Sequence, residues 1–155
     1  MLLRELFSPE DLIVGFDPAD KWQSIRDMVE HLERAKRLPE GHGPDVLEAV
    51  LAREKSMSTG MEHGVAIPHA AVDDLESVVA CMGIVTRDEG LAFESIDGQP
   101  ARIVVLLVIP RAQKLLHIRT LADVARAVAR EEVRRDLLAA SDAADAYEVL
   151  VRCEP

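Results

Sequence analysis

The stretch Arg102-Ile103-Val104-Val105-Leu106-Leu107-Val108-Ile109 is a nearly continuous run of Val, Ile and Leu. Such runs are typical of a central strand that is buried on both faces, because successive side chains point to opposite faces of a sheet. A strand of that kind needs helices on both sides to cover it. The stretch therefore predicts an α/β protein built around one fully buried strand.

Four other segments carry the short apolar runs expected of strands. They are Leu12–Val14, Val65–Ile67, Val78–Thr86 and Phe93–Ile96. Turn sequences at Arg87–Gly90 and Asp97–Gly98 are short enough to join neighbouring strands as hairpins. We therefore expect a mixed sheet, with both parallel and antiparallel pairs.

Five segments place apolar residues three or four positions apart, which is the spacing of one helix face. The expected helices run from Asp17-Pro18 to Pro39, from Pro44 to about Lys55, from near Leu115 through Val128, over Val133–Leu138, and from Ser141 through Val151. Asp17 and Ser141 are the expected caps of the first and last helices. Helices around buried strands predict a three-layer α/β/α sandwich, a mixed β-sheet flanked by helices, in a single domain over residues 1–155.

The composition excludes several classes of protein. The 155 residues include 18 Lys and Arg against 28 Asp and Glu, which gives a formal net charge of −10. An acidic chain with one Trp, one Tyr and three Phe lacks the basic patch and the aromatic platform of a nucleic-acid binder. Its apolar runs are shorter than the roughly 20 residues of a membrane-spanning helix, and its N-terminus has no signal-peptide pattern. Cys81 and Cys153 stand far apart, so we expect free thiols and a cytoplasmic protein.

His69 is the candidate reactive residue. It follows the apolar Val65-Ala66-Ile67 and then Pro68, whose ring fixes its own φ and favours an extended residue before it. The sequence therefore predicts that a strand presents His69 at its C-terminal end, where ligand sites of α/β sheets gather. Taken alone, the spacing is also that of an ordinary surface histidine at the end of a strand.

Three other features could complete a site around His69. The loop Ser58-Thr59-Gly60 offers hydroxyl and backbone N–H groups that can bind an anion. Arg53, near the end of the preceding helix, can act as a fork for a phosphate or carboxylate. His117 begins the inner stripe of the third expected helix and can bring a second imidazole close to the first. Each also has an ordinary interpretation, as a polar loop, a solvated arginine and a packed histidine.

Metal and other catalytic motifs find no support in the sequence. His63, His69 and His117 match none of the paired-ligand spacings of zinc sites, such as H-E-x-x-H. The chain has no serine elbow and no P-loop. We therefore expect no metal site.

The segment Arg53–His69, REKSMSTGMEHGVAIPH, resembles the phosphorylation-site signature of the fructose/mannitol-type IIA domains of the bacterial phosphotransferase system. That family includes stand-alone nitrogen-regulatory IIA proteins. Phe93–Pro110 resembles the stretch before the family's second histidine, and His117 with the residues after it resembles that histidine and its helix. Lys21–Leu38 resembles the family's first helix, so the resemblance covers most of the chain.

The resemblance implies a role for each candidate residue. His69 would carry a phosphoryl group on Nε2, and His117 would donate a hydrogen bond to a phosphoryl oxygen. Arg53 would neutralise charge, while Ser58, Thr59 and Gly60 would orient the phosphate loop. No metal or organic cofactor would be needed.

The same resemblance implies the partners. The phosphocarrier protein HPr would supply the phosphoryl group, and the acidic charge of this chain favours attraction to a basic HPr surface. The next partner would be a IIB component for sugar uptake or, in a nitrogen-type protein, a regulatory target. Met61, Glu62 and His63 depart from the usual family pattern. A glycine commonly stands in place of Met61, so Met61 either strains the loop or adds apolar docking surface. Because of these departures, a third possible function is that of a non-catalytic IIA-like binding module. Neither nucleic-acid binding nor direct membrane insertion is expected.

Overall fold

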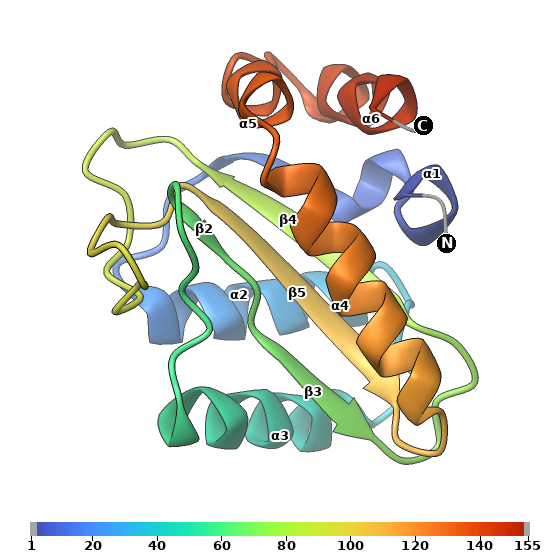
Figure 1. The fold of residues 1–155 in the computed structure, drawn as a ribbon. Coiled ribbons are helices and arrows are strands. Elements are labelled where there is room, and N and C mark those ends of the chain that lie inside the picture. The colour runs from blue at the N-terminus through green and yellow to red at the C-terminus, as the bar shows by residue number, and fades with distance from the viewer. Residues whose placement is uncertain (1–2, 154–155) are drawn as a thin grey trace.

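A computed structural model describes residues 3–153 and shows helices on both sides of one open sheet (Figure 1). The helices are α1 (Leu3–Leu6), α2 (Lys21–Arg34), α3 (Gly43–Ser56), α4 (Lys114–Val128), α5 (Glu131–Leu138) and α6 (Ala143–Arg152). The strands are β1 (Leu12–Phe16), β2 (Val65–Ala66), β3 (His69–Val72), β4 (Val79–Val85) and β5 (Ile103–Pro110). A short 3-10 turn, η1 (Pro9–Asp11), precedes β1. Within the described residues, no helix is both long and apolar enough to cross a membrane.

Strand β5 is the central element of the sheet. The strand order is β1-β4-β5-β2, and β3 also pairs with β5. The β4–β5 pair is antiparallel, whereas β1 is parallel to β4, and β2 and β3 are parallel to β5. The expected mixed sheet is therefore confirmed.

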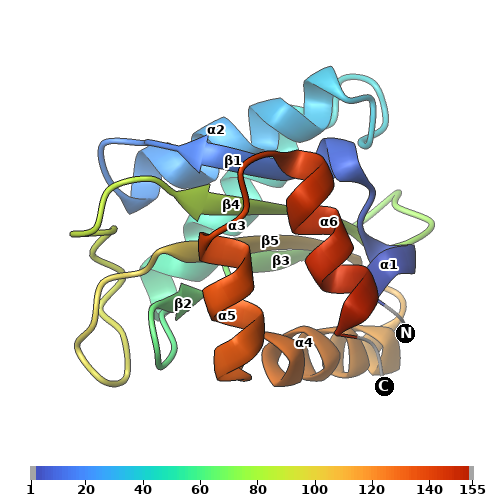
Figure 2. The same cartoon turned by 90° about the horizontal axis from the view of Figure 1, so that it is seen from above.

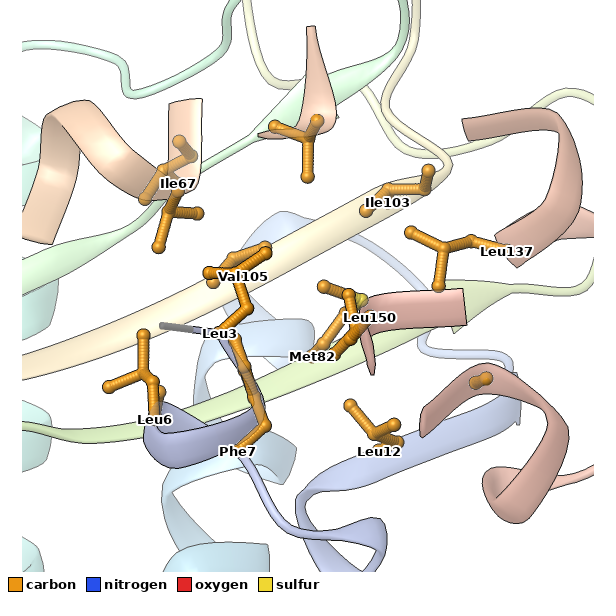
Figure 3. Packing of buried hydrophobic residues seen from close by; sticks show 14 of the residues in the cluster. Leu3, Leu6, Phe7, Leu12, Ile67, Met82, Ile103, Val105, Leu137 and Leu150 are labelled. Carbon is orange, nitrogen blue, oxygen red and sulfur yellow. The ribbon is translucent and has the colours of Figure 1, made fainter. Parts of the chain in front are cut away.

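Alternate residues of β5 supply the two hydrophobic cores. Ile103, Val105, Leu107 and Ile109 pack with apolar residues of α4, α5 and α6, as the close view in Figure 3 shows for part of this core. Val104, Leu106 and Val108 pack on the other face with apolar residues of α2 and α3. Viewed from above, the two groups of helices lie on opposite sides of the sheet (Figure 2). The three-layer α/β/α sandwich is thus confirmed.

The ends of helix α2 differ from the prediction. Asp20, not Asp17, caps the helix and accepts a hydrogen bond of 2.8 Å from the Gln23 backbone N–H. Asp17 instead accepts a hydrogen bond from Arg87. The helix ends well before Pro39, because Lys36 adopts a left-handed φ of 58° and the next backbone N–H bonds back to the carbonyl of Leu32.

The cap of the last helix also differs from the prediction. Asp142 rather than Ser141 caps α6, while the Ser141 hydroxyl donates to Asp145. Before β1, the chain forms the short helix α1 and the turn η1, for which the sequence analysis gave no prediction.

The prediction that a strand ends at His69 is wrong. Strand β2 stops at Ala66, and a second short strand, β3, begins at His69. Pro68 interrupts the ladder because it has no N–H to donate, although its carbonyl still accepts a hydrogen bond from Leu107.

The predicted strand at Phe93–Ile96 is absent from the structure. The connection between β4 and β5 pairs only at an isolated bridge between Leu91 and Ala101, and the turns at Arg87–Gly90 and Asp97–Gly98 lie within it. Phe93 is buried as a core residue rather than as part of a strand. The apolar residue there therefore anchors a loop.

Because β5 is buried on both faces, we predict that the stability of the fold depends strongly on Leu106. Replacing this fully buried side chain, Leu106→Ala, removes contacts to α2 and α3 and leaves a cavity. We expect the free energy of unfolding to fall by about 2–5 kcal/mol in urea titration. Leu115→Ala makes the same chemical change at a side chain that is 75% exposed, and we expect a change of less than about 0.5 kcal/mol. Equal losses in the two variants would contradict this account of the core.

Candidate functional site

Two histidine rings from different elements meet at one edge of the sheet. His69 opens β3, and His117 lies in the first turns of α4, the helix that follows β5. Their ring centroids are 5.5 Å apart and the rings are nearly perpendicular, at 78°. Since β3 pairs with β5 and α4 folds back over the sheet, the fold itself brings the two imidazoles together.

A backbone contact fixes the protonation pattern of the His69 ring. Nδ1 lies 2.8 Å from the carbonyl oxygen of Ile67. A carbonyl can only accept a hydrogen bond, so Nδ1 must carry the proton. In a neutral ring, Nε2 then has the free lone pair. Nε2 is therefore the nucleophilic nitrogen of this imidazole.

The surroundings of His69 favour its neutral form. Burial is the main cause that lowers the pKa of His69 below its ordinary value of 6.5, because desolvation penalises the charged ring. The hydrogen bond to Ile67 acts in the opposite direction, the nearby charges of Arg53 and His117 lower the pKa further, and Glu54 raises it. At neutral pH the ring is therefore ready to act as a nucleophile.

Arg53 and the Ser58-Thr59-Gly60 loop lie beside His69. All of them line one open hollow of about 500 Å³, together with apolar side chains that include Met57 and Ile96. Arg53 comes from the last turn of α3, and its Nη1 donates a hydrogen bond of 2.7 Å to the carbonyl of Met57. His117 does not line this hollow and approaches His69 from the α4 side.

The hydroxyl of Ser58 is engaged within the protein. It donates to the carbonyl oxygen of Phe93 and accepts a hydrogen bond of 3.1 Å from the Gly60 N–H. Glycine is needed at position 60 because a Cβ there would lie 2.7 Å from the same Phe93 carbonyl. Ser58 and Gly60 thus hold the loop against the connection between β4 and β5.

Thr59 is held by Glu54, which is paired in turn with Lys21, and the sequence analysis assigned no role to either charged residue. Glu54 accepts a hydrogen bond of 3.0 Å from the Thr59 N–H and one of 2.5 Å from its hydroxyl. Lys21 lies 3.2 Å from the same carboxylate, and both charged side chains are buried. A signal for Glu54 was present, since it continues the i, i+4 series of Val46 and Val50 on the buried face of α3.

The departures at positions 61–63 affect the loop differently from the expectation. Met61 does not have a positive φ, so the strain considered there is absent. The left-handed residues are His63, at 63°, and Gly64, at 75°. The backbone N–H of His63 donates a hydrogen bond of 2.9 Å to the Asp97 carboxylate, and His63 does not line the hollow beside His69. Met61 does line it and adds apolar surface.

The described residues hold no cluster of three His, Cys, Asp or Glu side chains that could bind a metal ion. Cys81 and Cys153 are both buried, and neither forms a disulfide with another of the described residues. Burial is the first cause that raises the pKa of the Cys81 thiol well above its usual range. This thiol is therefore unreactive.

Nitrogen regulatory protein IIA-Ntr from Neisseria meningitidis superposes on this structure with a TM-score of 0.83 at 25% sequence identity, covering 96% of this chain and 98% of that one. The fold is therefore that of a phosphotransferase-system IIA structure.

The chain belongs to the family described as phosphoenolpyruvate-dependent sugar phosphotransferase system, EIIA 2, whose profile matches residues 5–153. A nitrogen regulatory protein from Bradyrhizobium diazoefficiens is 32% identical over 151 residues, which is 97% of this chain and 95% of that protein. The fructose-specific EIIABC component of Bacillus subtilis is 31% identical over 140 residues, covering 90% of this chain but 21% of the longer relative. The family thus contains both sugar-specific and nitrogen-regulatory relatives of this chain.

The lowered pKa of His69 leads to a pH prediction. In an NMR titration, we expect the ring to protonate only as the pH falls below the 6.5 of a free histidine. Arg53→Met should raise the pKa of His69 towards that value, because it removes a repelling positive charge. Lys55→Met removes an exposed charge two residues away and serves as the control. A His69 pKa above 6.5 in the native protein would contradict the prediction.

Proposed function

We propose that this chain acts, as one IIA domain over residues 1–155, as a phosphohistidine carrier that accepts a phosphoryl group from HPr on His69. The observation that carries the proposal is the hydrogen bond between His69 Nδ1 and the Ile67 carbonyl, which leaves Nε2 as the nucleophile. The lone pair of Nε2 attacks phosphorus, the N–P bond of the donor phosphohistidine breaks, and its electron pair returns to the donor ring. A cytoplasmic location belongs to the same proposal.

His117 and Arg53 are the proposed electrostatic partners of the transfer. Phosphoryl transfer passes through a loose transition state, so catalysis consists mainly of in-line positioning and charge neutralisation. An imidazole 5.5 Å from the His69 ring centre is close enough to donate to a phosphoryl oxygen on Nε2. Arg53 lines the same hollow as His69 and supplies positive charge there.

The family suggests two roles for the phosphorylated protein. In the first, His69 passes it to a IIB component for sugar uptake, as the fructose-specific relative suggests. In the second, the phosphorylation state of a nitrogen-type IIA protein controls a regulatory target. The match to a nitrogen regulatory protein along nearly the whole of both chains favours this second role. Genes for IIB and IIC components beside this one would favour the first, and nitrogen-control genes the second.

The carrier function is tested by phosphorylation with phosphoenolpyruvate, enzyme I and HPr. We expect an acid-labile phosphoryl group that disappears in His69→Ala. In His117→Ala, we expect transfer to be slower by roughly ten- to a hundred-fold, because a charge-assisted hydrogen bond contributes about 1.5–3 kcal/mol. His42→Ala, in the connector before α3, is the matched control and should transfer normally.

Three results of this experiment would count against the proposal. Absence of labelling with a cognate HPr would favour a non-catalytic IIA-like binding module. Labelling that survives in His69→Ala would move the phosphoryl group to another residue. Unchanged kinetics in His117→Ala would remove His117 from the mechanism.

A further inference from the structure

A continuous series of hydrogen bonds connects a buried ion pair to the His69 ring. Lys21 contacts the Glu54 carboxylate at 3.2 Å, and the same carboxylate accepts both hydrogen bonds of Thr59. The carbonyl of Thr59 accepts a hydrogen bond of 3.1 Å from the Ile67 N–H. The carbonyl of Ile67 then accepts from His69 Nδ1 at 2.8 Å. Successive contacts in the series share one residue, so the series is unbroken from Lys21 to His69.

We propose that Glu54 is a positioning residue that, with its charge neutralised by Lys21, fixes Thr59 and through it the Ile67 carbonyl that orients the His69 ring. The proposal deepens the carrier function and rests on it as far as the transfer rate is concerned. Glu54 acts through other residues, because its side chain is fully buried and cannot touch a partner protein.

The chemistry of the pair explains why two charges are buried here. The carboxylate accepts the Thr59 backbone N–H on Oε2 and the Thr59 hydroxyl on Oε1, whereas a Gln amide would have an NH2 group, which can only donate, in place of one of these oxygens. A buried carboxylate without a counter-charge would be costly, and it would also repel an incoming phosphoryl group. The positive charge of Lys21 offsets both the cost of burying the carboxylate and its repulsion of a phosphoryl group.

Lys21 is itself held in place from several sides. Its ammonium group lies 4.9 Å from the ring centre of Trp22 and 5.5 Å from that of Phe93, which are cation–π distances. It is also 3.8 Å from Glu94, an exposed carboxylate at the rim of the hollow beside His69. The ion pair therefore links the start of α2, the end of α3 and the connection between β4 and β5.

Other hydrogen bonds hold the rest of the loop, including one of 2.8 Å from the Met61 N–H to the carbonyl of Val65. Ser58 and Gly60 fasten the loop to Phe93, whereas Thr59 is the residue whose carbonyl meets Ile67. Loss of the Glu54 contacts would thus loosen Thr59, whose carbonyl accepts the hydrogen bond from the Ile67 N–H. The part that faces Phe93 would remain attached.

The test compares Glu54→Gln with Glu48→Gln, an exposed carboxylate on the same helix. Amide hydrogen exchange of Thr59 and Ile67 measures the order of the loop without any phosphoryl transfer. Transfer from phosphorylated HPr at saturating and limiting HPr separates the maximal rate from KM. In Glu54→Gln we expect faster exchange and a maximal rate lower by roughly ten- to a hundred-fold, with KM unchanged, because misplacement of a reacting group carries a penalty of that order. Glu48→Gln should behave as the wild type in both measurements.

A second pair of variants keeps the test valid if Glu54→Gln does not fold. Thr59→Val keeps the side-chain shape but loses the hydroxyl, whereas Thr59→Ser keeps the hydroxyl. We expect Thr59→Val to show the same losses and Thr59→Ser to retain most of the rate. Lys21→Arg should likewise preserve both readouts, and Lys21→Met should not.

The outcomes separate this proposal from the carrier function. Unchanged exchange in the folded Glu54→Gln and Thr59→Val proteins would overturn the positioning role. Faster exchange with an unchanged transfer rate would overturn it as well. If the wild type accepts no phosphoryl group from HPr, the carrier function fails, while the exchange data still decide whether Glu54 orders the loop.

Discussion

Strand β5 is buried along all eight of its residues, and this burial constrains the rest of the structure. Its alternate side chains pack into two separate hydrophobic cores, so helices must lie on both faces of the sheet. The same strand pairs with β2 and β3 on one side and with β4 on the other. Every element that supplies a candidate site residue is therefore positioned, directly or through one neighbour, by β5.

The candidate site arises where this arrangement meets a break in the sheet. Between β2 and β3, Pro68 interrupts the pairing with β5, and the chain turns so that the His69 ring bonds back to the carbonyl of Ile67. Helix α4 returns across the sheet and brings His117 to the same place. A local irregularity thus selects the reactive nitrogen, and the regular fold supplies its neighbour.

The parts that could be predicted from the sequence are those set by side-chain periodicity. The continuous apolar run of β5 indicated a covered central strand, and the helical stripes indicated the layers. His69, Arg53 and the 58–60 loop were identified by their motif, and the structure brings them together. Helix starts were less predictable, because Asp17 and Asp20 are equally good caps by residue type. The spacing along α3 could have shown that Glu54 is buried, but its pairing with Lys21 depends on two helices meeting, which neither sequence segment shows alone.

The nitrogen that carries the phosphoryl group is the most direct test of the whole account. Nitrogen-15 NMR of the phosphorylated protein, with labelled histidine, distinguishes the two ring nitrogens of His69. The account predicts phosphorus on Nε2 and a proton on Nδ1, held by the Ile67 carbonyl. Phosphorus on Nδ1 would contradict it, because that nitrogen could not then donate the hydrogen bond that orients the ring.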